Sequence, residues 1–143
     1  MFYERRTPYK STPPAIDMIR GLAPLASYIS SLSLKGWQIT AEVIVAIAEA
    51  LPTLGSLSLQ CCTLDKGAWR ELLTLTSVSE LTLESTPCGL VPLTAFASNV
   101  RHEVSLNLGY GCMKPQSYKA FEDSVPTLSA KRECAQLPPF HLN

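Results

Sequence analysis

A leucine pair with one residue between its members recurs along the chain at an almost constant interval. Its four copies are Leu32/Leu34, Leu57/Leu59, Leu81/Leu83 and Leu106/Leu108. The steps between successive pairs are 25, 24 and 25, and the first two pairs stand in the same tetrapeptide, SLSL. A fixed period of this length is typical of chains that stack copies of one small structural unit. The repeat therefore constrains the fold more than any other feature of the sequence.

The positions around each pair repeat as well. Apolar residues come three positions before the first leucine or five positions after the second: Ile29, Leu54, Val78, Ile39, Leu64, Cys88 and Met113. Segments 39–54 and 113–128 align without a gap at an offset of 74, and both end in PTL. The shared pattern is LxxLxLxx(W/C/T/G)xL.

This pattern predicts a short strand followed by a returning helix in each copy. Alternate side chains of a strand point to opposite faces, so the two leucines of a pair share one buried face. Apolar residues then recur at helical spacing between the strands, in 43–51, 69–73 and 118–125. Pro115 fits a first helical turn. The third returning segment carries Pro92, so we expect only a short or 3₁₀ helix over 93–98.

Residues 28–128 resemble the leucine-rich repeat family, whose signature is LxxLxLxx(N/C)xL. The similarity is to the short, cysteine-containing type found in ribonuclease inhibitor-like proteins. It implies an α/β solenoid of about four repeats, with parallel strands on the concave face and helices on the convex face. The turn position that holds Asn or Cys in the family holds four different residues here, namely Trp37, Cys62, Thr86 and Gly111.

The ends of the chain differ in composition from the repeats. Residues 1–14 hold Pro8, Pro13 and Pro14 together with three basic residues, which predicts an extended arm. Residues 15–27 place apolar side chains at three-residue steps, and we interpret them as an N-terminal capping helix over the first repeat. Residues 129–143 form the C-terminal tail or cap.

Charge and hydropathy exclude several classes of protein. Twelve basic and twelve acidic residues give a net charge of zero, with an excess of basic residues in the two ends. The longest apolar run, residues 43–54, is interrupted by Glu49 and is shorter than the roughly 20 residues that span a bilayer, so no membrane span is expected. No secretory signal pattern begins the chain. We therefore expect an intracellular protein, and the sequence leaves mitochondrial and cytoplasmic locations open.

Motifs for catalysis and for cofactors are missing from the sequence. It has two histidines and no HExxH, GxSxG, P-loop or GxGxxG motif, so we predict neither an enzyme nor a cofactor. The five cysteines form no CxxC pair, and we expect reduced, mostly buried thiols. One arguable zinc set exists, and a metal or redox role for it is the remote hypothesis because Cys62 and Cys88 occupy inward positions. That set is Cys61, Cys62, Cys88, Cys112 and His102.

The remaining candidates are surfaces that bind other macromolecules. The outward positions of the strands predict a smooth, weakly charged face of Ser33, Lys35, Ser58, Gln60, Thr82, Glu84 and Asn107. The tails offer basic and aromatic residues, namely Phe2, Tyr3, Arg5, Arg6, Tyr9, Lys10 and Phe140.

We predict a structural, protein-binding subunit of a larger intracellular complex. Small leucine-rich repeat accessory subunits that this chain resembles include the factor B-like proteins of ATP synthase. The alternative is an RNA-associated component of a ribosome or mitochondrial ribosome that docks through its basic arm.

Overall fold

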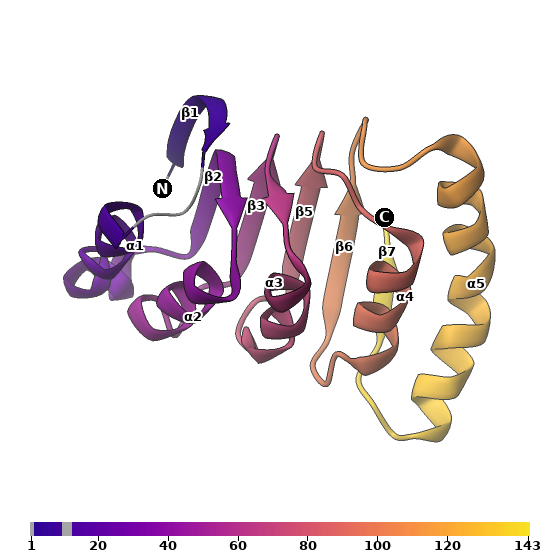
Figure 1. The fold of residues 1–143 in the computed structure, drawn as a ribbon. Coiled ribbons are helices and arrows are strands. Elements are labelled where there is room, and N and C mark those ends of the chain that lie inside the picture. Colours follow the sequence, from indigo (N-terminus) through magenta and orange to yellow (C-terminus); the bar gives the residue numbers. More distant parts are fainter. Residues whose placement is uncertain (1, 10–12) are drawn as a thin grey trace.

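The structure, a computed structural model, describes residues 2–9 and 13–143 of the chain, with side chains from residue 16 onward. In this part of the chain, six strands lie side by side in a curled, parallel sheet with helices along one face (Figure 1). Their order is β1 (Phe2–Tyr9), β2 (Ser31–Ile39), β3 (Ser56–Gln60), β5 (Glu80–Glu84), β6 (Val104–Leu108) and β7 (Phe140–Leu142). The two-residue strand β4 (Thr63–Leu64) pairs with the end of β2.

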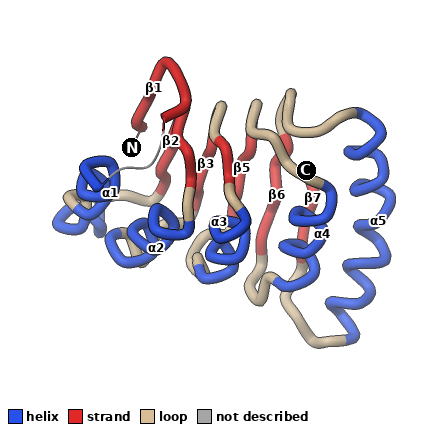
Figure 2. The backbone as a smooth tube through the Cα atoms, viewed as in Figure 1, coloured by secondary structure: helices blue, strands red, loops and turns tan. Residues whose placement is uncertain are grey.

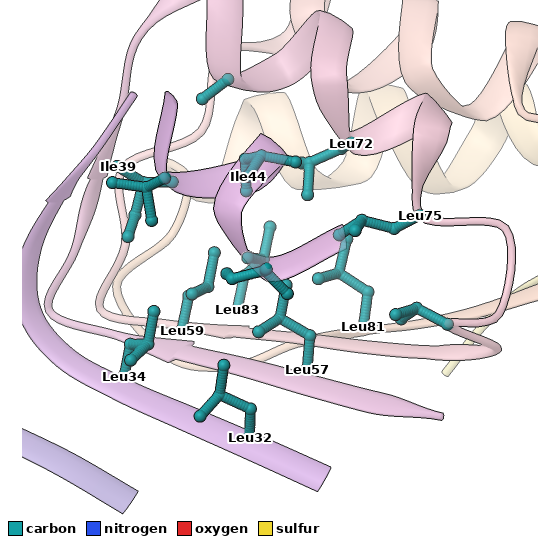
Figure 3. Close-up of a cluster of buried hydrophobic side chains, with 14 of the residues drawn as sticks. Leu32, Leu34, Ile39, Ile44, Leu57, Leu59, Leu72, Leu75, Leu81 and Leu83 are labelled. Carbon is teal, nitrogen blue, oxygen red and sulfur yellow. The ribbon is translucent and has the colours of Figure 1, made fainter. Parts of the chain in front are cut away.

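The predicted α/β class is confirmed, and the leucine pairs align between neighbouring strands. Leu32 pairs with Leu57, Leu57 with Leu81 and Leu81 with Leu106. The second leucines pair in the same order, from Leu34 through to Leu108. The side chains of the first three pairs point from the sheet toward the helices and form the core together with Ile39, Ile44, Leu72 and Leu75 (Figure 3). Leu106 is buried in the same core, and Leu108 packs against it.

A helical segment follows most strands and returns the chain to the start of the next one (Figure 2). The segments are α1 (Pro13–Arg20) with the 3₁₀ helix η1 (Ala23–Tyr28), α2 (Ala41–Ala50), α3 (Lys66–Glu71) with the 3₁₀ helix η2 (Leu72–Thr74), α4 (Leu90–Asn99) and α5 (Pro115–Cys134). Each α-helix packs against the next in chain order. Their apolar residues cover one face of the sheet and leave the other face open.

The third returning segment differs from the prediction of a short or 3₁₀ helix. Helix α4 is a ten-residue α-helix. Pro92 is its third residue, where a backbone N–H has no partner within the helix, so the proline removes no hydrogen bond. The shortest α-helix that follows a repeat strand is instead α3, with six residues before the chain tightens into η2.

Both ends of the chain extend the architecture. Strand β1 pairs in parallel with β2, and α1 directs Ile16 and Ile19 into the core. Helix α5 begins at Pro115 as predicted but continues to Cys134, past the expected end of the fourth repeat at 128. Strand β7 then pairs in parallel with β6, so the C-terminal segment adds a strand to the sheet.

Arg132 joins this C-terminal segment to helix α4. Its side chain is 3% exposed, and its guanidinium donates to the carbonyl oxygens of Ala97, Val100 and Pro138. Two of these carbonyls end α4, where a cation is favoured by the negative end of the helix dipole. The buried charge thereby fixes α5 to the end of α4.

Candidate binding surfaces

A row of hydrogen-bonding side chains holds the turns that follow the strands. The Sγ of Cys62 lies 3.4 Å from the carbonyl oxygen of Leu34, and the Oγ1 of Thr86 lies 3.0 Å from that of Leu59. The Sγ of Cys112 lies 3.0 Å from the carbonyl oxygen of Leu83. Each side chain follows one strand and donates to a backbone carbonyl oxygen of the preceding strand in the sheet. It thereby satisfies carbonyl groups where the hydrogen bonds between the strands end. We call Cys62, Thr86 and Cys112 the turn ladder.

The turn ladder corrects one sequence assignment, because Cys112 and not Gly111 takes the fourth position. The turn after β6 is one residue longer, since Cys112 follows Leu108 by four residues whereas Cys62 follows Leu59 by three. Gly111 instead has a φ of 83°, in the left-handed region that suits glycine. The matching residues of the two preceding turns, Cys61 and Ser85, hold φ angles of 52° and 48°.

The predicted strand face is assembled by the strand pairing. Neighbouring strands place Ser33, Ser58, Thr82 and Asn107 in one row and Lys35, Gln60 and Glu84 in a second. The amide Nδ2 of Asn107 lies 3.2 Å from the Oγ1 of Thr82 and 3.3 Å from the Oε1 of Glu80. The face is polar, and its role in binding stays a prediction.

The tail residues fall into two groups. The side chains of Phe2, Tyr3, Arg5, Arg6 and Tyr9, and all of Lys10, lie outside the described part of the structure. Phe140, by contrast, is 4% exposed and packs edge-to-face against Phe121, with ring centroids 6.5 Å apart. The prediction that Phe140 contacts a partner is wrong for this structure, because a ring buried in the core offers almost no surface.

An apolar groove between α3 and α4 is a surface feature that the sequence did not predict. Its volume is about 330 Å³. Among its lining residues, the ring of Trp69 meets that of Phe96 edge-to-face with centroids 6.2 Å apart, and Val91 is 79% exposed. The described residues that line this α3–α4 groove are Lys66, Trp69, Arg70, Leu73, Val91, Pro92, Ala95, Phe96 and Asn99.

The charged residues that line the α3–α4 groove are all basic. Lys66 and Arg70 lie four residues apart on α3, both are exposed, and none of the nine described lining residues is acidic. The pattern of apolar residues on α4 could have indicated this surface. Val91 lies on a different face of the helix from Leu93, and Leu93 is fully buried.

The cysteines are less uniformly buried than expected. All five are free thiols: Cys62 and Cys112 are buried, Cys88 is half-buried, and Cys61 and Cys134 are exposed. The backbone N–H of Cys88 donates to the carbonyl oxygen of Cys112 over 2.8 Å. These two cysteines are one repeat period apart, and this spacing is the sequence feature that could have placed them side by side.

Residues 2–9 and 13–143 present neither a metal-ligand cluster nor a membrane-spanning helix. No group of three or more His, Cys, Asp or Glu side chains in these ranges could hold a metal ion. In the same ranges, no helix is both long and apolar enough to cross a bilayer.

His102 is half-buried, with its Nε2 2.9 Å from the carbonyl oxygen of Val78, and burial lowers the pKa of its imidazole.

Comparison of the chain with protein-family models, with curated proteins and with solved structures found no match in any of the three.

Proposed function

We propose that this chain is a short leucine-rich repeat solenoid and a non-enzymatic, protein-binding subunit of a larger intracellular assembly. The in-register leucine pairs and the turn ladder support the solenoid, because both recur once per repeat period. A stack of this kind presents extended surfaces for binding along its strands and its helices.

The α3–α4 groove is the observation that carries the binding role. Large apolar side chains exposed in a hollow are costly in water and are typical of interaction sites. Val91, which is 79% exposed, supplies the main apolar surface of the groove, and it lines the groove together with the largely buried ring pair of Trp69 and Phe96. The strand face is polar by comparison and serves as a secondary contact.

The occupant that fits the α3–α4 groove is an acidic amphipathic helix of a partner subunit. Apolar side chains on one face of such a helix would fill the hollow. Acidic side chains flanking that face would approach Lys66 and Arg70, the two cations of the lining. The phosphates of an RNA strand could also pair with these two cations, but the aliphatic side chains of the lining provide no hydrogen-bond donors for them.

The test compares two substitutions of the same kind in the full chain. Val91→Glu places a carboxylate in the α3–α4 groove, whereas Val45→Glu changes an apolar residue on α2 that is 37% exposed and outside the groove lining. Native gels of cell extracts should show the wild type and Val45→Glu in a high-mass complex, and Val91→Glu as free chain. A wild-type chain that migrates as a free monomer would contradict the proposal.

RNA binding through the basic arm stays an alternative prediction. Its carriers, Arg5, Arg6 and Lys10, have no described side chains. Substituting these residues and measuring RNA binding tests the alternative.

A further inference from the structure

Cys88 and Cys112 lie next to each other on neighbouring turns, those that follow β5 and β6. The backbones of the two residues are joined by a hydrogen bond, and each thiol is close enough to shift the pKa of the other. Backbones joined in this way run about 4.8 Å apart. A disulfide joins residues whose Cα atoms lie within about 6.8 Å of each other, so the backbone hydrogen bond brings the two residues within the reach of a bridge.

The pair borders a hollow at the surface, with Cys88 half-buried and Cys112 5% exposed. Both cysteines line a shallow hollow of about 550 Å³ together with Gly89, Gly111, Lys114 and Ser117. Cys88 comes two residues before the first residue of α4 and Cys112 three residues before that of α5, so both precede the positive ends of helices in the chain. Lys114 is exposed and adds a positive charge. Electropositive, partly open surroundings of this kind favour a reactive thiolate.

The pKa values of the two thiols are shifted in opposite directions. The hydrogen bond from Cys88 lowers the pKa of the Cys112 thiol to about 6, with help from the backbone of Thr86, Gly109 and Ser85 and against the effect of burial. The same hydrogen bond, followed by burial, raises the pKa of Cys88. Of the two, Cys112 is therefore the thiol that loses its proton more readily and becomes the attacking sulfur.

We propose that Cys88 and Cys112 are a peroxide-sensitive dithiol that closes into a reversible disulfide between the turns after β5 and β6. The Cys112 sulfur attacks one oxygen of hydrogen peroxide, an S–O bond forms, the O–O bond breaks, and the released hydroxide takes a proton from solvent. The Cys88 sulfur then attacks the Cys112 sulfur, the S–S bond forms, and the S–O bond breaks. The Cys88 proton leaves with the hydroxyl as a second water. Two electrons pass from the sulfurs to the peroxide oxygens.

The remaining cysteines provide controls within the same chain. Cys62 is fully buried, its thiol donates to backbone carbonyls, and burial raises its pKa. Cys61 and Cys134 are exposed. Their oxidation therefore shows how much peroxide reacts with a thiol that is merely accessible. The substitutions Cys61→Ser and Cys134→Ser leave the pair unchanged.

The experiment exposes the reduced full chain to hydrogen peroxide, blocks residual thiols with iodoacetamide and maps tryptic peptides by mass spectrometry. Cleavage at Arg70, Arg101 and Lys119 separates the cysteines into peptides 71–101 and 102–119. These two peptides should be linked in the wild type and in the Cys61→Ser/Cys134→Ser double variant. The link should disappear with dithiothreitol, and it should be absent from Cys88→Ser and from Cys112→Ser.

Melting temperature gives an independent readout. Oxidation should raise the melting temperature of the wild type and leave that of Cys88→Ser unchanged, because only the wild type closes the bridge. Peroxide treatment that yields no link between 71–101 and 102–119 would overturn the proposal. So would links from Cys61 or Cys134 in equal amount.

Discussion

Replacing Thr86 by valine removes one hydroxyl from a fully buried position and keeps the shape of the side chain. The Oγ1 of Thr86 accepts the backbone N–H of Cys62 at 3.3 Å and lies 3.0 Å from the carbonyl oxygen of Leu59. A buried group that loses its partner costs about 1–3 kcal/mol, whereas the added methyl returns about 0.8 kcal/mol. We therefore expect Thr86→Val to lower the free energy of unfolding by about 2 kcal/mol.

Denaturant unfolding under reducing conditions measures this difference. At about 2.1 cal/mol/K of unfolding entropy per residue, the same loss lowers the melting temperature by about 7 °C. Two controls accompany it: Thr86→Cys, which restores a donor of the kind found at Cys62 and Cys112, and Thr53→Val at an exposed position. Both should stay within about 0.5 kcal/mol of the wild type. If Thr86→Val matched the wild type, or if Thr86→Cys lost as much, the turn ladder would have no energetic role.

Three further predictions concern the C-terminal anchor, the strained turns and the arm. Arg132→Met should lower the free energy of unfolding by about 3 kcal/mol, because three carbonyl oxygens lose a charged donor. The control Lys131→Met, at an exposed position, should change it little. Equal stabilities of the two variants in a denaturant titration would refute this prediction. Ser85→Gly should stabilise the chain by up to about 1 kcal/mol because Ser85 holds a φ of 48°, and a loss of melting temperature would refute this. If the arm binds RNA, Arg5→Ala with Arg6→Ala should flatten the salt dependence of filter binding, and an unchanged slope would dismiss the alternative.

The sequence predicted the strands and the relation between them because the leucine pairs directly record which side chains point inward. Equal spacing then placed Leu57 beside Leu32 and Leu81 beside Leu57, as the strand pairing confirms. The same spacing aligned Ser33, Ser58, Thr82 and Asn107 on the open face. Periodicity is reliable here because a core position tolerates little change in the size or polarity of its side chain.

Features that depend on loops and helix ends were not predicted. One extra residue after Leu108 moved the ladder position from Gly111 to Cys112 without disturbing the leucine period. Pro92 was expected to shorten its helix, but its effect depends on where the helix begins, and α4 begins two residues earlier. The burial of Phe140 depends on β7 joining the sheet after α5, which no repeat pattern encodes.

The candidate site was predicted only in part, since exposure follows from how neighbouring helices pack. Val91 and Leu93 look alike in sequence, yet one is 79% exposed and the other fully buried. The α3–α4 groove lies where α4 packs beside the six-residue helix α3, with Val91 exposed and Trp69 only 9% exposed. Such a hollow is a property of two elements together, and neither sequence segment contains it alone.

Photo-cross-linking from the α3–α4 groove tests the binding role most directly. A benzophenone amino acid at position 91 of the full chain, with position 45 as the matched control, is irradiated in cells, and the cross-linked peptides are sequenced. The account predicts one dominant protein adduct from position 91, in a segment with acidic residues flanking an apolar helical face, and no such adduct from position 45. Equal adducts from both positions, or cross-links to nucleic acid alone, would contradict it.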